Sequence, residues 1–159
     1  MSIEPPEWLP EIIPWDGDWE RYVETLYGAY TRTYTEKSPF YYRNMVVKSR
    51  RREVVDGKDG GFWHIIGGSN GYPEPVRCER VLWARAIIEN ANDARVLVWD
   101  EPSPHDGGVV DTVFWLKDLD YYVIIARRTN CWVIRSAYSV VYDSKRKRLE
   151  RNYNIYGKK

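Results

Sequence analysis

The chain has 159 residues, close to the commonest size of a single domain, and its 43% hydrophobic and 30% charged residues are typical of a globular protein. No stretch approaches the roughly 20 apolar residues of a membrane-spanning helix, and the acidic, proline-rich start lacks the basic region of a signal peptide. The composition therefore excludes a membrane protein, and we expect a single cytoplasmic domain with no membrane partner.

Charge is unevenly distributed behind a net charge of only +1. Residues 1–40 hold eight acidic and three basic side chains, whereas residues 144–159 hold seven basic side chains and one acidic. A second basic cluster, KSRRRE, lies at 48–53. Such runs are usually solvated surface, yet basic clusters also fit a phosphate backbone, and the acidic start fits a protein surface. RNA and a protein bound by the N-terminal segment are therefore both candidate partners.

The first half of the chain is predicted to be mainly helical. Residues 1–17 form a proline-rich segment that cannot hold a long helix. With Asp16 or Asp18 as its cap, an aromatic-rich helix is predicted to run to near Thr35. Its core face holds the residues at helical spacing, namely Trp19, Tyr22, Val23, Leu26, Tyr27 and Tyr30. Residues 39–61 fit either short strands or a basic loop.

A second helix is predicted over 77–91, in the stretch RCERVLWARAIIENA. It follows a short apolar segment, FWHIIGG at 62–68, and a polar loop. Arg77 and Arg80 lie one turn apart on this helix, so they can share a face. Residues 18–92 thus make up the expected helical half of the domain.

Four strands are predicted in the second half, where hydrophobicity changes from a helical to an alternating period. Their connections, PSPHDGG, KDL and TN, are short, so neighbouring strands should pair antiparallel as a meander over 95–142. The strands are RVLVWDE (95–101), VVDTVFWL (109–116), DYYVIIARR (120–128) and CWVIRSAYSVVY (131–142). The predicted fold is α+β, with N-terminal helices packed on a sheet of four or more antiparallel strands. The basic tail at 143–159 is expected to fray beyond a helical turn.

The last predicted strand carries an unusual pair of hydroxyl groups. Because side chains alternate along a strand, Ser136 and Tyr138 share one face, about 7 Å apart. Trp132 and Ile134 lie on that same face, and Arg135 lies on the opposite one. The pair is either a hydrogen-bonded detail of the core or the edge of a working site.

Candidate chemistry comes from histidine, arginine and hydroxyl groups. No phosphate-binding loop or metal-ligand spacing is present, so we expect no cofactor and no metal, and Cys78 and Cys131 as free thiols. His64 interrupts an apolar run and is either a core histidine or a general acid or base. Arginines that can bind phosphate lie on the second helix, at the end of the third strand and within the fourth strand: Arg77, Arg80, Arg127, Arg128 and Arg135. This inventory suits metal-free phosphoryl transfer, in which a base activates a ribose 2′-OH.

Helices followed by a four-stranded antiparallel meander, with a histidine before the sheet, resemble the barnase–EndoU–colicin–RelE superfamily of small ribonucleases. The segments FWHII, RCERVLWARAIIEN and VIRSAY look like a phage- and prophage-associated branch of it, over roughly residues 18–153. The resemblance implies an RNA endonuclease that needs no metal. Arg77, Arg127 and Arg135 are the expected substrate contacts. The resemblance assigns catalytic roles to His64, Arg80, Arg128, Ser136 and Tyr138.

In this interpretation His64 acts as general base or acid, and Arg80 and Arg128 hold the scissile phosphate. Tyr138 donates a proton or stacks on a base, while Ser136 positions the phosphate or Tyr138. The alternative is a non-catalytic binding or partner-docking module of phage or prophage origin with the same fold. Its support is the acidic N-terminal segment and the aromatic excess of 8 Trp, 13 Tyr and 3 Phe.

Overall fold

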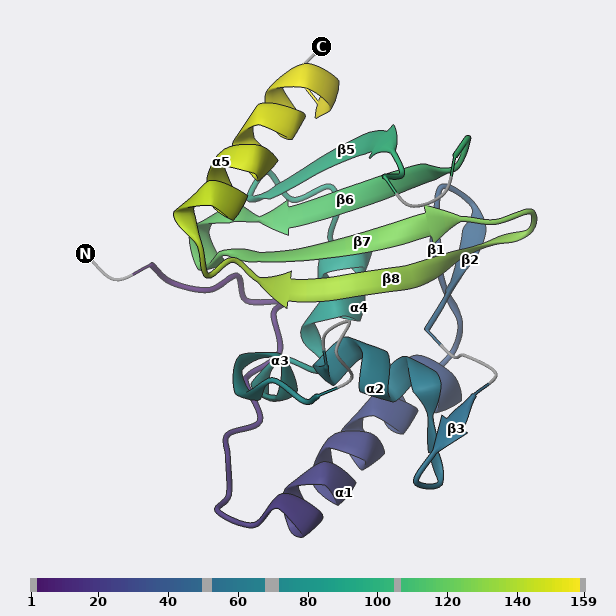
Figure 1. Ribbon diagram of the computed structural model, residues 1–159, viewed down its shortest axis with the longest axis vertical. Helices are drawn as coiled ribbons and strands as arrows, with labels where there is room; N and C mark the ends of the chain where they lie inside the picture. Colours follow the sequence, from purple (N-terminus) through teal and green to yellow (C-terminus); the bar gives the residue numbers. More distant parts are fainter. Residues whose placement is uncertain (1–2, 50–52, 68–71, 105–106, 158–159) are drawn as a thin grey trace.

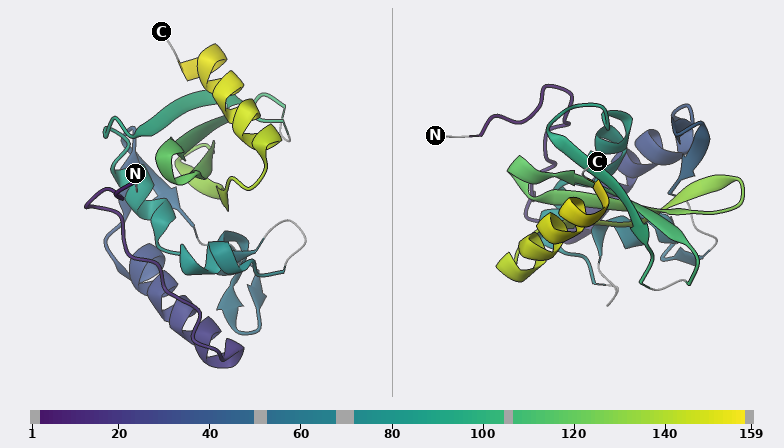
Figure 2. Two further views of the ribbon diagram at one scale, coloured as in Figure 1. Left: turned by 90° about the vertical axis from the view of Figure 1, so that its left-hand side faces the viewer. Right: turned by 90° about the horizontal axis from the view of Figure 1, so that it is seen from above.

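The structure, a computed structural model, describes residues 3–49, 53–67, 72–104 and 107–157. Its fold is α+β, as the sequence predicts (Figure 1). Helices from the first half of the chain pack on a six-stranded sheet, and a C-terminal helix lies against the opposite face of the sheet (Figure 2). Residues 50–52 of the basic KSRRRE cluster lie outside the described residues.

Along the chain, short strands and a group of helices follow the first helix, and the four long strands of the sheet come after them. The helices and helical turns are α1 (Trp19–Tyr30), η1 (Thr31–Glu36), α2 (Gly60–Ile66), α3 (Pro75–Glu79), α4 (Trp83–Glu89), η2 (Lys117–Leu119), α5 (Asp143–Asn152) and η3 (Tyr153–Gly157). The strands are β1 (Phe40–Tyr42), β2 (Met45–Lys48), β3 (Val54–Val55), β4 (Lys58–Asp59), β5 (Val96–Pro102), β6 (Val110–Leu116), β7 (Tyr121–Arg127) and β8 (Cys131–Ser139). Within the described residues, no helix has both the length and the apolar character that crossing a membrane requires.

The first helix forms where the sequence predicts it. Asp18 caps α1, because its carboxylate accepts a hydrogen bond from the Arg21 backbone N–H at 3.3 Å. The helix continues as wider π-helical turns to Glu36, close to the predicted end near Thr35. Its buried face packs against α2 in one hydrophobic cluster, which includes Tyr22, Leu26, Tyr30, Phe62, Ile65 and Ile66.

The predicted second helix over 77–91 is divided into α3 and α4. The chain turns tightly between them: the Arg80 N–H donates to the Arg77 carbonyl at 3.2 Å. The Val81 N–H donates to the Cys78 carbonyl at 3.3 Å in the same way. Residues before the turn pack with α1, and residues after it pack on the sheet. A single straight helix is therefore wrong, because one face of it could not reach both cores.

The sheet has the strand order β1-β2-β8-β7-β6-β5. Strands β5 to β8 pair antiparallel in chain order, which confirms the predicted meander. Strand β2, however, pairs parallel with β8, with Val46 opposite Cys131, so the purely antiparallel sheet is wrong and the sheet is mixed. The ambiguous segment 39–61 supplies the hairpin β1–β2, and the helices and strands between β2 and β8 form the long crossover that parallel pairing requires.

Both faces of the sheet carry packed helices. On one face Ile87 and Ile88 of α4 join the main core with Phe114. On the other face Leu149 of α5 packs with Trp115 and its neighbours. The predicted frayed tail is therefore wrong for the described residues of the C-terminal segment, since burial of Leu149 holds α5 against the sheet.

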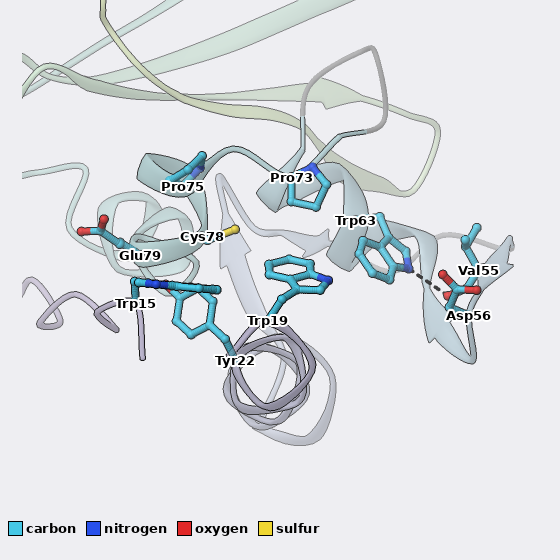
Figure 3. A pocket seen from close by; sticks show the side chains of 10 residues that line it. All are labelled: Trp15, Trp19, Tyr22, Val55, Asp56, Trp63, Pro73, Pro75, Cys78 and Glu79. Atoms are coloured by element: carbon cyan, nitrogen blue, oxygen red, sulfur yellow. Dashed lines mark hydrogen bonds between the residues drawn. The ribbon is translucent and has the colours of Figure 1, made fainter. Parts of the chain in front are cut away.

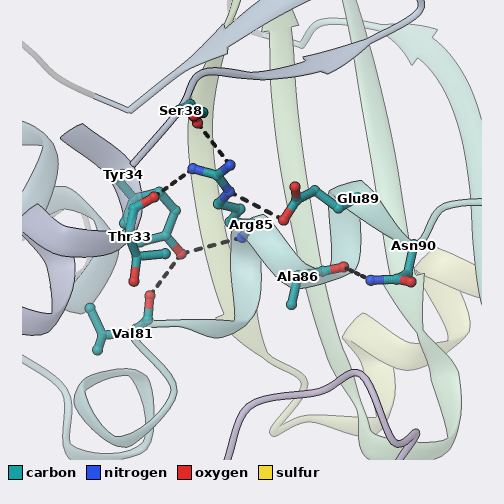
Figure 4. A network of polar contacts seen from close by, with 8 residues as sticks. All are labelled: Thr33, Tyr34, Ser38, Val81, Arg85, Ala86, Glu89 and Asn90. Carbon is teal, nitrogen blue, oxygen red and sulfur yellow. Dashed lines mark hydrogen bonds and ion pairs between the residues drawn. The ribbon is translucent and has the colours of Figure 1, made fainter. Parts of the chain in front are cut away.

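A buried arginine ties the end of the first helical segment to α4 (Figure 4). The Arg85 guanidinium donates to the carbonyl oxygens of Thr33 at 2.7 Å and Ser38 at 2.9 Å. It also donates to the Glu89 carboxylate at 3.2 Å and lies over the Phe40 ring, 4.6 Å from its centroid. A buried charge is stable only when its donors are paired. The pairing of Arg85 therefore holds residues 33–38, which lead into β1, against α4.

The two cysteines, which are free, should differ in reactivity. Cys78 is buried, and desolvation raises the pKa of its thiol to about 11, whereas Cys131 is partly exposed. At about pH 8 we expect iodoacetamide to label Cys131 in the native protein and Cys78 only after unfolding in urea, because the reactive species is the exposed thiolate. Mass spectrometry of the labelled peptides measures both sites. Rapid native labelling of Cys78 would contradict its position beneath α1.

Candidate functional site

A β-bulge in β8 sets the geometry of the candidate site. Ile124 of β7 lies opposite Ser136, whereas the next residue, Ile125, lies opposite Ile134. Arg135 is therefore the one additional residue that β8 has between these two pairs, which makes it the bulge residue. Such a bulge interrupts the alternation of side chains and re-aims those on either side of it.

The bulge changes which side chains share a face of the sheet. Trp132 and Ile134 pack in the main core beneath α4. Ser136 and Tyr138 face α5 instead, and Arg135 reaches the same side. The faces predicted from strict alternation are therefore wrong, because the two hydroxyls are separated from the core residues and Arg135 joins them.

The face turned toward α5 holds a cleft of about 210 Å³ between β6–β8 and α5. The lining mixes aromatic rings with charged and hydroxyl groups. The side chains that bear on its chemistry are Asp111, Arg135, Ser136, Tyr138, Lys145 and Arg148. Two strands, β6 and β8, and the helix α5 thus supply these groups of one small polar cleft.

Lys145 is a cation of the cleft that is partly buried against an aromatic ring. Its ammonium nitrogen lies 5.1 Å from the centroid of the Tyr122 ring. Burial, and to a smaller extent the charge of Arg148, lowers the pKa of Lys145 below that of a free lysine. Its amine therefore loses the proton at lower pH than a solvated lysine does, which suits a proton acceptor.

The carboxylates of the cleft already interact with other side chains of the protein. Asp111 Oδ1 lies 3.3 Å from Arg135 Nε. Glu101 accepts a hydrogen bond from the Trp99 indole N–H at 2.6 Å. Within the described residues Arg148 makes no ion pair, so its positive charge is available to a ligand. The cleft is thus suited to an anionic group.

Tyr138 is held in place by stacked groups. Its ring is stacked with that of Tyr122 at a centroid distance of 5.4 Å. The Arg77 guanidinium carbon lies 4.2 Å from the Tyr138 ring centroid. The Ser136 hydroxyl donates to the Tyr138 oxygen at 3.4 Å, which leaves the Tyr138 hydrogen available for donation to a ligand.

Arg77 and His64, two predicted site residues, lie beside the bulge at the edge of β8. Arg77 is 1% exposed and donates to the Ile65 carbonyl at 3.1 Å and the His64 carbonyl at 2.7 Å. The His64 ring makes a hydrogen bond through Nε2 to the Arg135 carbonyl. Since a carbonyl only accepts, Nε2 carries the hydrogen. His64 thus supports the bulge from α2 and is not among the residues that line the cleft.

Arg80 lies away from the cleft, in the turn after α3. Its guanidinium stacks over the Trp83 ring at 4.9 Å and approaches the Glu79 carboxylate at 3.8 Å. Its Nη1 also donates to the Val76 carbonyl at 3.1 Å. The helix break therefore separates Arg80 from Arg77, with which the sequence predicts a shared face.

Arg127 and Arg128 lie at the far end of the β7–β8 hairpin. Arg127 is opposite Trp132, which is six residues before Tyr138 and hence roughly 15–20 Å from it along the strand. Arg128 follows in the turn, where its N–H donates to the Cys131 carbonyl. The structure therefore brings together only part of the predicted set: His64, Arg77, Arg135, Ser136 and Tyr138.

Sequence reasoning misses two cations of the cleft, Lys145 and Arg148, because it assigns them to a solvated tail. A signal for them is present. They are three residues apart and lie on the same side of a helix as Leu149, the only apolar residue of α5. A helix over 143–152 with Leu149 packed on the sheet also directs Lys145 and Arg148 toward the sheet.

Comparisons with known proteins identify no relative of this chain. No protein-family model, curated protein or solved structure matches this chain. The resemblance to small ribonucleases therefore stays an expectation, and a function has to be inferred from the side chains of the cleft.

Replacing Arg77 tests the link between the helices and β8. Arg77→Met removes two hydrogen bonds to α2 and the stacking on Tyr138, so we expect the free energy of unfolding to fall by about 3 kcal/mol. Arg80→Met, three residues later on a more exposed side chain, should cost less than about 1 kcal/mol. Urea unfolding followed by circular dichroism measures both variants. Equal losses would mean that Arg77 has no special structural role.

Proposed function

We propose that the chain is an RNA endonuclease that acts without a metal ion, in the cleft between β8 and α5. The observation that carries the proposal is a set of cations beside two hydroxyl groups: Arg135, Lys145 and Arg148 next to Ser136 and Tyr138. Cations hold a phosphate, and hydroxyl and amine groups transfer protons, which are the two requirements of phosphodiester transphosphorylation. An RNA substrate also agrees with the cytoplasmic location that the sequence predicts.

The size of the cleft supports a phosphodiester as its occupant. Its volume of about 210 Å³ is below the roughly 300–1,000 Å³ of pockets that enclose whole small molecules. The bases of a bound RNA would therefore lie outside it. The exposed basic side chains Lys147 and Arg151 extend the positive surface of α5, where a phosphate backbone would bind in a salt-dependent way.

In the proposed reaction the neutral amine of Lys145 accepts the proton of a ribose 2′-OH, and the 2′-oxygen attacks the adjacent phosphorus. The bond from phosphorus to the 5′-oxygen breaks, and the Tyr138 hydroxyl donates a proton to that leaving oxygen. Arg135 and Arg148 stabilise the added negative charge on the phosphate in the transition state. The products are a 2′,3′-cyclic phosphate and a 5′-hydroxyl. Exchange with water then returns a proton to Tyr138 and removes one from Lys145.

His64 acts in this proposal as a positioning residue. The sequence assigns it an acid–base role, whereas its hydrogen bond to the Arg135 carbonyl supports a role in holding the bulge. Arg77 acts similarly, through its stacking on Tyr138. Both residues then affect the rate through the geometry of the groups that contact the RNA.

The test is cleavage of a short fluorescent RNA in excess EDTA. We expect Tyr138→Phe and Lys145→Gln each to lower the cleavage rate about 100-fold or more, because each removes a proton-transfer group. Lys37→Gln removes the same charge from an exposed position at the end of η1, outside the cleft, and should leave the rate unchanged. The wild-type rate should rise as pH rises through the pKa of Lys145, since the deprotonated amine is the base, and Lys145→Arg should abolish that rise.

Two results would contradict the proposal. Equal cleavage by the wild type, Tyr138→Phe and Lys145→Gln would identify a contaminating nuclease. A loss of wild-type cleavage in EDTA, restored by a divalent cation, would identify a metal-dependent reaction.

A further inference from the structure

A second and larger cavity, of about 980 Å³, lies among the helices and away from the cleft. It is bounded by the segment before α1, by α1 itself, by α2 and α3, and by the β3–β4 turn. Figure 3 shows its aromatic rings in a row, with Trp15 and Tyr22 at one end, Trp19 in the middle and Trp63 at the other. We call this cavity the aromatic groove. Pro73 and Pro75 lie across from the rings.

The apolar surface of the aromatic groove is exposed to an unusual degree. Trp15 is 55% exposed and Trp19 is 39% exposed, and Val55 at the opposite end is half exposed. Scattered exposed apolar side chains are normal, but several that line one concavity mark a surface that another molecule covers. Tryptophan is also the residue most enriched among those that dominate binding energy.

The walls of the groove are formed before any ligand binds. The Trp15 ring packs edge-on against Tyr22 at a centroid distance of 5.2 Å. The Tyr22 hydroxyl donates to the Ile13 carbonyl at 2.6 Å, and the Trp63 indole N–H donates to the Val55 carbonyl at 2.9 Å. These contacts fix the rings, so binding need not order them first.

Charge around the groove selects the kind of partner. Among the residues that the structure describes, the lining includes Asp56 and Glu79 and no basic side chain. Glu79 is partly compensated by Arg80 at 3.8 Å, whereas Asp56 makes no ion pair with any described residue. Asp18, the cap of α1, comes directly before Trp19 of the lining in the sequence. This surface repels a phosphate backbone and attracts basic side chains.

Hydrogen-bond donors in the groove point to an extended ligand. The indole N–H groups of Trp15 and Trp19 have no acceptor among the described residues. A polyproline II segment has unpaired carbonyl groups, which accept such bonds, and its proline rings pack between aromatic side chains. The indoles of Trp15 and Trp19, with their free N–H donors, are therefore suited to that conformation.

We propose that the aromatic groove docks a proline-containing segment of a protein partner in polyproline II conformation, flanked by basic residues. The proposal does not depend on RNA cleavage in the cleft. The groove includes Trp15 of the acidic N-terminal segment, for which the sequence predicts a protein partner. Helix α3 connects the two surfaces, because its Arg77 stacks on Tyr138 of the cleft and its Cys78 and Glu79 line the groove.

The test is the fluorescence anisotropy of a short labelled peptide with a Pro-Leu-Pro-Pro core between pairs of arginines. We expect saturable binding to the full chain and a shift of tryptophan emission to shorter wavelength. Trp19→Ala and Asp56→Lys should each raise Kd about tenfold or more, the first by removing a ring and the second by reversing the groove charge. Tyr41→Ala, which removes an aromatic ring of β1 that is 60% exposed outside the groove, should leave Kd unchanged.

Two control peptides make the outcome decisive. Replacing the arginines by glutamates, or the prolines by serines, should each weaken binding about tenfold or more, because each removes one element of the proposed recognition. Equal binding of the three peptides, or equal Kd for the wild type and the folded Asp56→Lys variant, would overturn the proposal. So would an absence of peptide binding together with a dimer that Trp19→Ala dissociates, which would assign the groove to a second copy of the chain.

Discussion

Arg77 brings a positive charge into a site where its side chain is almost fully buried, and the other contacts of the candidate site depend on how that charge is satisfied. Its donors reach two carbonyl groups of α2, and its guanidinium lies on the ring of Tyr138 in β8. Strand β8 pairs with β2 only over the residues from Cys131 to Val133. The rest of this edge of β8 is covered by other elements. Arg77 supplies that cover and joins the helical half to the last strand.

The bulge at Arg135 complements this contact on the other side of the sheet. It lets one strand contribute Ile134 to the main core and Ser136 to the cleft, although only one residue, Arg135, lies between them. His64 stabilises the bulge from outside by bonding its carbonyl. In a strand with unbroken alternation, Ile134 and Ser136 would lie on the same face, in the main core. The cations of α5 would then have no hydroxyl pair opposite them.

Local patterns in the sequence predict the elements that depend on local physics. The four strands β5 to β8 with their antiparallel pairing and the cap at Asp18 are of this kind, and both are confirmed. The parallel pairing of β2, the helix break near Arg80 and the anchoring of α5 by Leu149 depend on contacts between distant segments, so short windows do not reveal them. The bulge has no glycine to mark it. As a result the sequence finds Ser136 and Tyr138 but misses Lys145 and Arg148.

The central claim is that the cleft uses the 2′-oxygen of RNA as the nucleophile, and one comparison tests it most directly. An RNA oligonucleotide and the DNA of the same sequence are incubated with the chain, and the products are identified by mass spectrometry. Binding of both with similar dependence on salt, and cleavage of the RNA alone to a 2′,3′-cyclic phosphate, is the predicted result. Cleavage of both strands, or of neither, would contradict the account.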